Sequence, residues 1–157
     1  METLKRFLDE LDFFNGLNQE YLDLLVECAS NVRFFPGEFL FREGEKADNF
    51  YVIRAGRVTV EEPVPGFGSL TIQTLGKGDV IGWSWLFKPH IARINIKSQH
   101  ETQVLAFDGS CLRGKCEKNH DLGYELMQRF SHVVISRLQA TRLQLVEVCK
   151  QPANLVM

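Results

Sequence analysis

The sequence has no long run of apolar residues, which argues against a membrane-spanning protein. A helix that crosses a bilayer needs roughly 20 consecutive, mostly apolar residues, and no segment of the 157 residues approaches that length. The opening residues, Met1 to Arg6, lead into an amphipathic acidic segment rather than into the apolar stretch of a secretory signal. We therefore expect a cytoplasmic protein with no membrane partner.

An excess of one charge is also lacking. The 18 Lys and Arg residues and 20 Asp and Glu residues give a formal net charge of −2, so the surface as a whole does not attract nucleic acid backbones. The sequence contains no nucleophile elbow, no cluster of metal ligands and no complete P-loop. It therefore argues against an enzyme and against direct binding of nucleic acid.

Cysteine is scarce, and the four residues do not form a recognisable site. Cys28 and Cys149 lie in helical apolar patterns, and we interpret them as small buried hydrophobic residues. Cys111 and Cys116 are five positions apart and would point to different faces of a helix, which suits a shared metal poorly. We expect structural or free thiols, with no metal and no redox role.

The patterns that are present predict one domain with a β centre. Hydrophobic residues make up 45% of the chain, as in an ordinary globular protein. Apolar spacing predicts helices over 2–11 and 19–29, the second capped by Asn18. Short segments rich in β-branched and aromatic residues then alternate with glycine and proline turns, which indicates a double-sheet architecture. We predict N-terminal helices over 1–31, a β-roll over 32–108, C-terminal helices over 109–150 and a disordered tail over 151–157.

The C-terminal helices carry a second pattern. Asp108 or Ser110 can cap a short helix through Cys116, and Asp121 can cap a longer one that reaches about Cys149. Along the longer helix a seam recurs in steps of four and three, formed by Phe130, Val134, Leu138, Thr141, Leu145 and Val148. Its far half has no obvious partner within the chain, so it predicts a homodimer through this helix. The alternative is that the helix folds back on the β-roll.

Residues 36–60, PGEFLFREGEKADNFYVIRAGRVTV, resemble the first half of a cyclic-nucleotide-binding domain, with glycines 37, 44 and 56 at tight turns. The likeness continues through residues 76–82, GKGDVIG, and the order of elements agrees over roughly residues 5–149. The resemblance implies a mainly β fold with flanking helices, a double-stranded β-helix or jelly roll with a long C-terminal dimerisation helix. It also implies a regulatory domain like the effector domain of the catabolite activator protein.

In that family a turn-to-helix segment and an arginine hold the phosphate of the ligand, and a glutamate holds the ribose. The matching segment here begins at Gly82, but Trp83 stands in the place of the glutamate. Arg93 is the candidate phosphate arginine when counted forward from Gly82, whereas Ala92 takes that position when counted back from Asp108. The segment's expected ligand-binding residues are Gly82, Trp83, Ser84, Trp85, Leu86, Arg93 and Asn95.

Two further features have alternative interpretations. Trp83 and Trp85 either stack on a planar ligand or are core aromatics that close the mouth of the β-roll. Residues 137–142, RLQATR, resemble the stretch where the catabolite activator protein contacts an adenine base. Thr141 matches a base-contacting threonine and Arg142 replaces a serine, so both join the expected ligand set. A threonine on a coiled-coil seam is equally well explained as a residue that sets the register.

Three functions follow. The first is a sensor that binds cyclic AMP, cyclic GMP or another small anionic effector and signals through the C-terminal helix. The second is a domain that has lost its ligand and binds other proteins; a filled pocket beside Arg93 would favour it. The third is a transcription regulator, which needs a partner to supply DNA binding because only eight residues follow Cys149.

Overall fold

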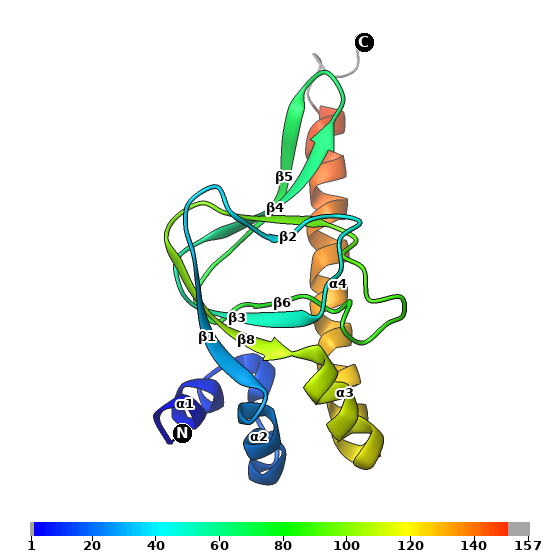
Figure 1. The fold of residues 1–157 in the computed structure, drawn as a ribbon. Helices are drawn as coiled ribbons and strands as arrows, with labels where there is room; N and C mark the ends of the chain where they lie inside the picture. The colour runs from blue at the N-terminus through cyan, green and yellow to red at the C-terminus, as the bar shows by residue number, and fades with distance from the viewer. Residues whose placement is uncertain (1, 151–157) are drawn as a thin grey trace.

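The computed structural model describes residues 2–150, in which two four-stranded antiparallel sheets face each other (Figure 1). The first sheet has the order β1 (Ala29–Phe34), β8 (Thr102–Asp108), β3 (Asn49–Ala55) and β6 (Val80–Ile81). The second has the order β2 (Phe39–Phe41), β7 (Asn95–Ser98), β4 (Val58–Val64) and β5 (Gly68–Leu75). This is the jelly-roll arrangement that the sequence predicts. The predicted tail, 151–157, lies outside the described residues.

Along the chain, helices precede and follow the strands. α1 (Glu2–Asp9), the short 3-10 helix η1 (Asp12–Phe14) and α2 (Gln19–Val26) come first, and α3 (Gly109–Lys118) and α4 (His120–Lys150) come last. The predicted second helix extends to residue 29, but α2 ends at Val26 and the chain enters β1 at residue 29. The reason is tertiary, since residues 29–31 pair with β8 across the sheet, which local propensity does not show.

The helix caps follow local chemistry. The Asn18 side chain accepts a hydrogen bond from the Glu20 N–H, and the Asp108 side chain accepts from two N–H groups in the first turn of α3, as predicted. The cap expected at Asp121 is instead made by Asn119, whose Oδ1 accepts from the Leu122 N–H at 3.2 Å. α4 therefore begins at His120, just before the residue expected to cap it.

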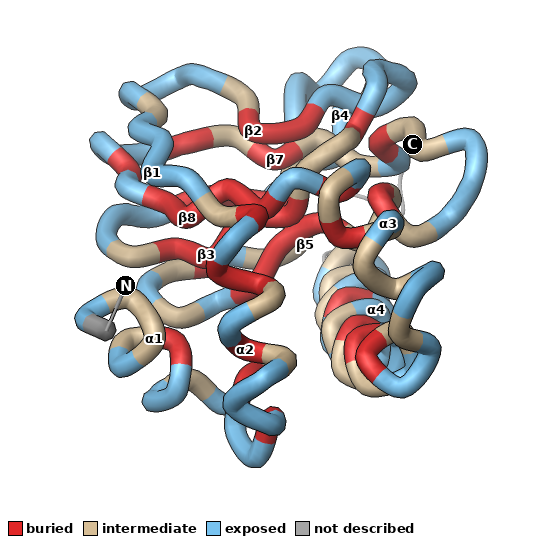
Figure 2. Tube along the Cα trace, turned by 60° about the horizontal axis from the view of Figure 1, so that its bottom comes forward, coloured by how far each residue is buried: buried red, intermediate tan, exposed pale blue. Residues whose placement is uncertain are grey.

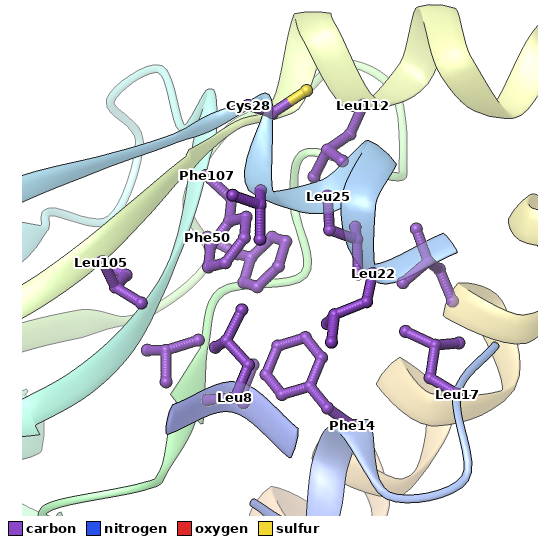
Figure 3. Packing of buried hydrophobic residues seen from close by; sticks show 14 of the residues in the cluster. Leu8, Phe14, Leu17, Leu22, Leu25, Cys28, Phe50, Leu105, Phe107 and Leu112 are labelled. Carbon is purple, nitrogen blue, oxygen red and sulfur yellow. The ribbon is translucent and has the colours of Figure 1, made fainter. Parts of the chain in front are cut away.

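The first sheet forms the middle layer of the molecule, and its inner strands β3 and β8 are buried on both faces, whereas β1 is largely exposed. Successive side chains of a strand point to opposite faces, so Phe50 and Val52 of β3 pack against the helices while Tyr51 and Ile53 pack between the sheets. Figure 2 shows β3 and β8 as mostly buried. Figure 3 shows Phe50 and Phe107 beside leucines of the N-terminal helices. The two rings are stacked, with centroids 4.4 Å apart.

α4 is a 31-residue helix that stands beside the sheets and continues along the β4–β5 hairpin (Figure 1). Its buried residues are Leu122, Leu126, Phe130 and Arg137. The predicted seam is wrong at Phe130, which contacts Phe50 and Trp85 in the core. Val134, Leu138, Thr141 and Leu145 are exposed, and Val148 is half-buried. The near half of the helix therefore folds onto the β-roll, and the far half leaves its apolar side chains uncovered.

Two of the cysteine predictions are wrong. Cys28 is buried in the core as predicted, but it is not a thiol, because a disulfide joins it to Cys111 across a sequence separation of 83 residues. Cys149 is exposed rather than buried. The disulfide is possible because Ala29 pairs with Phe107 in the sheet and the Asp108 N–H donates to the Cys28 carbonyl at 2.9 Å. This long-range register brings the end of α2 to the first turn of α3, toward which the Cys28 side chain points in Figure 3.

Within residues 2–150, no helix has both the length and the apolar composition that a bilayer crossing requires. In the same range, no group of three or more His, Cys, Asp or Glu side chains is arranged to hold a metal ion. The cytoplasmic location stays a prediction.

Candidate ligand site

The segment from Gly82 to Asn95, called the cassette below, connects β6 to β7 by turns. The Leu86 N–H donates to the Trp83 carbonyl at 3.0 Å, and the Phe87 N–H donates to the Ser84 carbonyl at 3.3 Å. His90 closes the loop, because its Nδ1 lies 2.9 Å from the Ser84 carbonyl oxygen. The structure describes every residue of the cassette and shows no helix in it. Several of its backbone donors are therefore used within the cassette itself.

Gly82 starts the cassette in a conformation that favours glycine. Its φ is +99°, and a Cβ atom placed there would lie 2.6 Å from Cζ of Phe41 and 3.2 Å from the Asn49 carbonyl oxygen. The backbone at Gly82 consequently lies directly against the Phe41 ring. This close approach brings β2, β3 and the beginning of the cassette together at one end of the β-roll.

The structure brings four of the predicted ligand residues together around one cavity. Gly82, Trp83, Ser84 and Arg93 line it, together with Phe41, Ala92 and Ile94. Its volume is only about 10 Å³, which is room for a single water molecule. Sites for small organic ligands span roughly 300–1,000 Å³. The cassette is therefore closed in this structure.

The arginine that sequence reasoning placed at the phosphate is on the surface. Arg93 is exposed, and its side chain has no hydrogen-bond or ion-pair partner among the described residues. Ala92, which takes the position of the phosphate arginine when counted back from Asp108, is 3% exposed and packs between the sheets. Asn95 is used structurally, because its Oδ1 accepts from the Glu43 N–H at 2.8 Å.

The two tryptophans of the cassette have different environments. Trp85 is fully buried and packs on Phe50, with ring centroids 5.7 Å apart, and on Phe130. It is a core aromatic, anchored also by Arg113 of α3, whose Nη1 donates to the Trp85 carbonyl at 2.7 Å. Trp83 is half-buried, lines the cassette cavity and packs against the core beside Leu86. Trp83 therefore separates the cassette cavity from the hydrophobic core.

Arg137 of α4 belongs to this site, although the sequence interpretation gave it no role of its own. Its guanidinium carbon lies 5.7 Å from the centroid of the Trp83 ring, and its Nη1 donates to Gln73 Oε1 at 2.6 Å. Burial lowers the pKa of Arg137 to about 10, against the attraction of the Asp79 carboxylate, so the side chain stays charged at neutral pH. The sequence could have indicated that Arg137 is buried, because its helical spacing places it on the same stripe as Leu126 and Phe130.

Thr141 and Arg142, the ligand residues predicted on the long helix, lie one turn beyond Arg137. Both are exposed, and neither lines the cassette cavity. The Thr141 hydroxyl donates to the Arg137 carbonyl at 2.8 Å, a bond that Thr often makes inside a helix. The structure therefore does not bring these two residues to the other predicted ligand residues.

Comparison with known proteins identifies the family. The model of the cyclic nucleotide-binding domain matches residues 31–119, more than half of the chain. The chain belongs to the cyclic nucleotide-binding domain family. The fold agrees, since a cyclic nucleotide-binding domain from Methylobacillus flagellatus superposes with a TM-score of 0.76 at 18% identity, covering 93% of this chain and 82% of that one.

Two curated relatives are similar to this chain over a small part of their own much longer chains. The voltage-gated delayed rectifier potassium channel KCNH8 of Mus musculus is 32% identical over an alignment of 170 residues that includes 87% of this chain. The cGMP-dependent protein kinase egl-4 of Caenorhabditis elegans is 28% identical over 107 residues, which cover 67% of this chain. The matches span only 15% of the channel and 14% of the kinase. The chain therefore matches only a small part of each of these two proteins.

Proposed function

We propose that this chain is a regulatory module that senses a small anionic effector in the cassette and transmits the signal through α4. The contact between Trp83 of the cassette and Arg137 of α4 carries this proposal. Trp83, which lines the cavity, lies against Arg137, a buried side chain of the long helix. Membership of the family and the likeness to a cGMP-dependent kinase support a cyclic nucleotide as the effector.

The closed cassette gives the sensor a resting state. An effector cannot enter a cavity of about 10 Å³ unless the lining side chains move, and Trp83 is the large half-buried one among them. Moving Trp83 removes the cation–π contact with Arg137, so cassette opening and the position of α4 are coupled. The observed affinity is then the intrinsic affinity reduced by the fraction of molecules that are open.

The signal passes in this proposal to a second copy of the chain. The exposed apolar residues on the far half of α4 include Leu138 at 60% and Leu145 at 64% exposure, next to the exposed Leu143 and Val146, and contiguous apolar surface of this kind marks interaction sites. A homodimer through this seam would convert a shift of α4 into a change between subunits. A transcription regulator whose partner supplies DNA binding is a further output of the same kind.

The size of the cassette cavity favours a second candidate. Trp85 is part of the core and Trp83 lines a space for one water molecule only. The second candidate is therefore a domain without a ligand, in which the exposed face of α4 binds another protein.

Isothermal titration with cyclic AMP and cyclic GMP separates the two candidates. We expect binding that weakens in Arg93→Ala and is unchanged in Arg57→Ala, a matched exposed arginine outside the cassette. Trp83→Glu supplies a charged acceptor for a ribose hydroxyl, a bond worth about 1.5–3 kcal/mol, so it should tighten binding by roughly tenfold to a hundredfold. No heat with either nucleotide, from the original chain or from Trp83→Glu, would reject a cyclic-nucleotide sensor and favour the ligand-free module.

A further inference from the structure

A groove of about 890 Å³ runs between α4, η1 and the connection from β5 to β6. Its volume lies within the range of small-molecule sites, roughly 300–1,000 Å³. No cassette residue from Gly82 to Asn95 lines it, but Arg137 is part of its wall. The groove is therefore a cavity separate from the cassette, with one arginine that touches both regions.

One edge of the Arg137 guanidinium is unused. Nη1 is held by Gln73, whereas Nε and Nη2 are buried and have no hydrogen-bond partner in the protein. Nε and Nη2 form the edge that can grip two oxygens of a carboxylate or phosphate in a bidentate pair. Arg137 is only 6% exposed, and buried polar groups are nearly always hydrogen-bonded. A free fork on a buried cation therefore suits an oxyanion.

The other charges of the groove limit the kind of anion. Lys77 is exposed on the wall and has no ion-pair partner among the described residues, so it can add a second positive charge. Arg129 is already bonded to Glu125 and to two backbone carbonyls. The carboxylates of Glu10, Asp12, Asp79 and Glu125 also line the groove, and Asp79 already attracts Arg137. These carboxylates would repel a polyanion. A ligand with one anionic group and a polar, uncharged remainder fits this distribution best.

We propose that this groove is a second ligand site, for a small molecule with a single carboxylate or phosphate group, and that Arg137 holds that group through Nε and Nη2. Both nitrogens are covered in this structure, so the ligand displaces a neighbouring side chain; Gln73, half-buried on the wall, is placed to move. Because Arg137 also lies against Trp83, binding in the groove alters the contact between α4 and the cassette. The site does not require a cyclic nucleotide in the cassette.

The Nε–H signals of the arginines in ¹⁵N-labelled protein report on this contact directly. Inorganic phosphate and acetate are titrated separately at constant ionic strength, with chloride as the balancing anion. The Arg137 signal is identified as the one absent from an Arg137→Met variant. We expect a saturable shift of this signal with phosphate or acetate, because a bidentate oxyanion changes the environment of Nε–H.

Substitutions on the exposed side of α4 test the place of binding without disturbing the core. Ser136 is exposed and lines the groove next to Arg137, so Ser136→Asp should weaken phosphate binding roughly tenfold by charge repulsion. Ser131 is also exposed on α4 but does not line the groove, so Ser131→Asp should leave the affinity unchanged. An Arg137 signal that stays still, or equal weakening by both substitutions, would overturn the proposal.

Arg93→Ala separates this site from the cassette, because Arg93 lines the cassette cavity and not the groove. The phosphate shift at Arg137 should persist in Arg93→Ala. If cyclic nucleotides do not bind but the Arg137 signal shifts with phosphate, the cassette sensor fails and the groove site stands. If cyclic nucleotides bind in an Arg93-dependent way and the Arg137 signal is insensitive to both anions, the groove site fails alone.

Discussion

At the scale of single residues, the indole of Trp83 lines the cassette cavity and also lies against the guanidinium of Arg137. Cation–π contacts of this kind contribute about 0.5–2 kcal/mol, enough to change the proportions of closed and open cassettes several-fold. Arg137 is charged and buried, which is costly unless its donors are used. We infer that this unfavourable free energy is tolerated because Arg137 contacts both the groove and the cassette.

Gly82 permits a prediction at the same scale. Gly82→Ala places a methyl group against Phe41 in a backbone of φ +99°, so strain and overpacking together should lower the free energy of unfolding by about 2–4 kcal/mol. Gly37→Ala is the matched control, because Gly37 has φ +90° but nothing within 4 Å of a built Cβ. Its loss should be about 1–2 kcal/mol. Urea unfolding measures both, and equal losses would show that the contact with Phe41 relaxes freely.

At the level of helices and strands, two interactions join the end of α2 to α3: one disulfide and one ion pair. The Cys28–Cys111 disulfide joins the end of α2 to the first turn of α3, and Lys115 of α3 forms an ion pair with Glu27 beside it. α3 also holds the cassette, through the bond from Arg113 to the Trp85 carbonyl. The position of α3, and therefore the entry into α4, is thus tied to both the N-terminal helices and the cassette.

Removing the disulfide should destabilise the fold. Cross-linking a loop of 83 residues restricts the unfolded chain strongly, so Cys28→Ser, or dithiothreitol added to the original chain, should lower the free energy of unfolding by about 2–4 kcal/mol. Cys116→Ser is the control, because Cys116 is a free, half-buried thiol, and this variant should remain sensitive to dithiothreitol. An identical urea midpoint with and without reductant would mean that the disulfide contributes nothing to stability.

At the scale of the whole molecule, α4 has two different faces. One face packs on the sheets and N-terminal helices through Leu122, Leu126 and Phe130. Another carries exposed apolar side chains, among them Tyr124, Met127, Leu138 and Leu145. Positions that repeat in steps of three and four form a continuous stripe. The molecule therefore presents an uncovered seam along a helix that is anchored in its core.

The seam predicts a change of mass on substitution. Leu138→Glu and Leu145→Glu each place a charge in a helix interface and should convert the proposed dimer to a monomer, observed by sedimentation velocity over a range of concentrations. Gln139→Glu is the control, because Gln139 is exposed on α4 but lies off the seam, and it should not change the mass. A monomer at every concentration of the original chain would refute self-association through α4.

Much of the fold was predictable because its signals are local. A cap needs only a side-chain oxygen two or three residues before the N–H that it accepts, as at Asn18 and Asp108. Most strands between positions 32 and 108 were predictable for the same reason, since alternation and turn residues act over a few positions. The two-residue strand β6 (Val80–Ile81) was not predicted. The candidate site was less predictable. Its segment was located, but its closure by Trp83 and the burial of Arg137 depend on packing.

Local patterns were enough to predict the family, the two-sheet architecture and the order of the helices, because turns, caps and apolar periods are properties of neighbouring residues. The buried face of α4 depends on packing in three dimensions, because the spacing of Phe130 fits the apolar seam whereas its ring packs in the aromatic core. The same holds for the pairing of Cys28 with Cys111 and for the position of Arg137 between the cassette and the groove. These outcomes depend on strand register and packing between segments far apart in the chain, which no local pattern specifies.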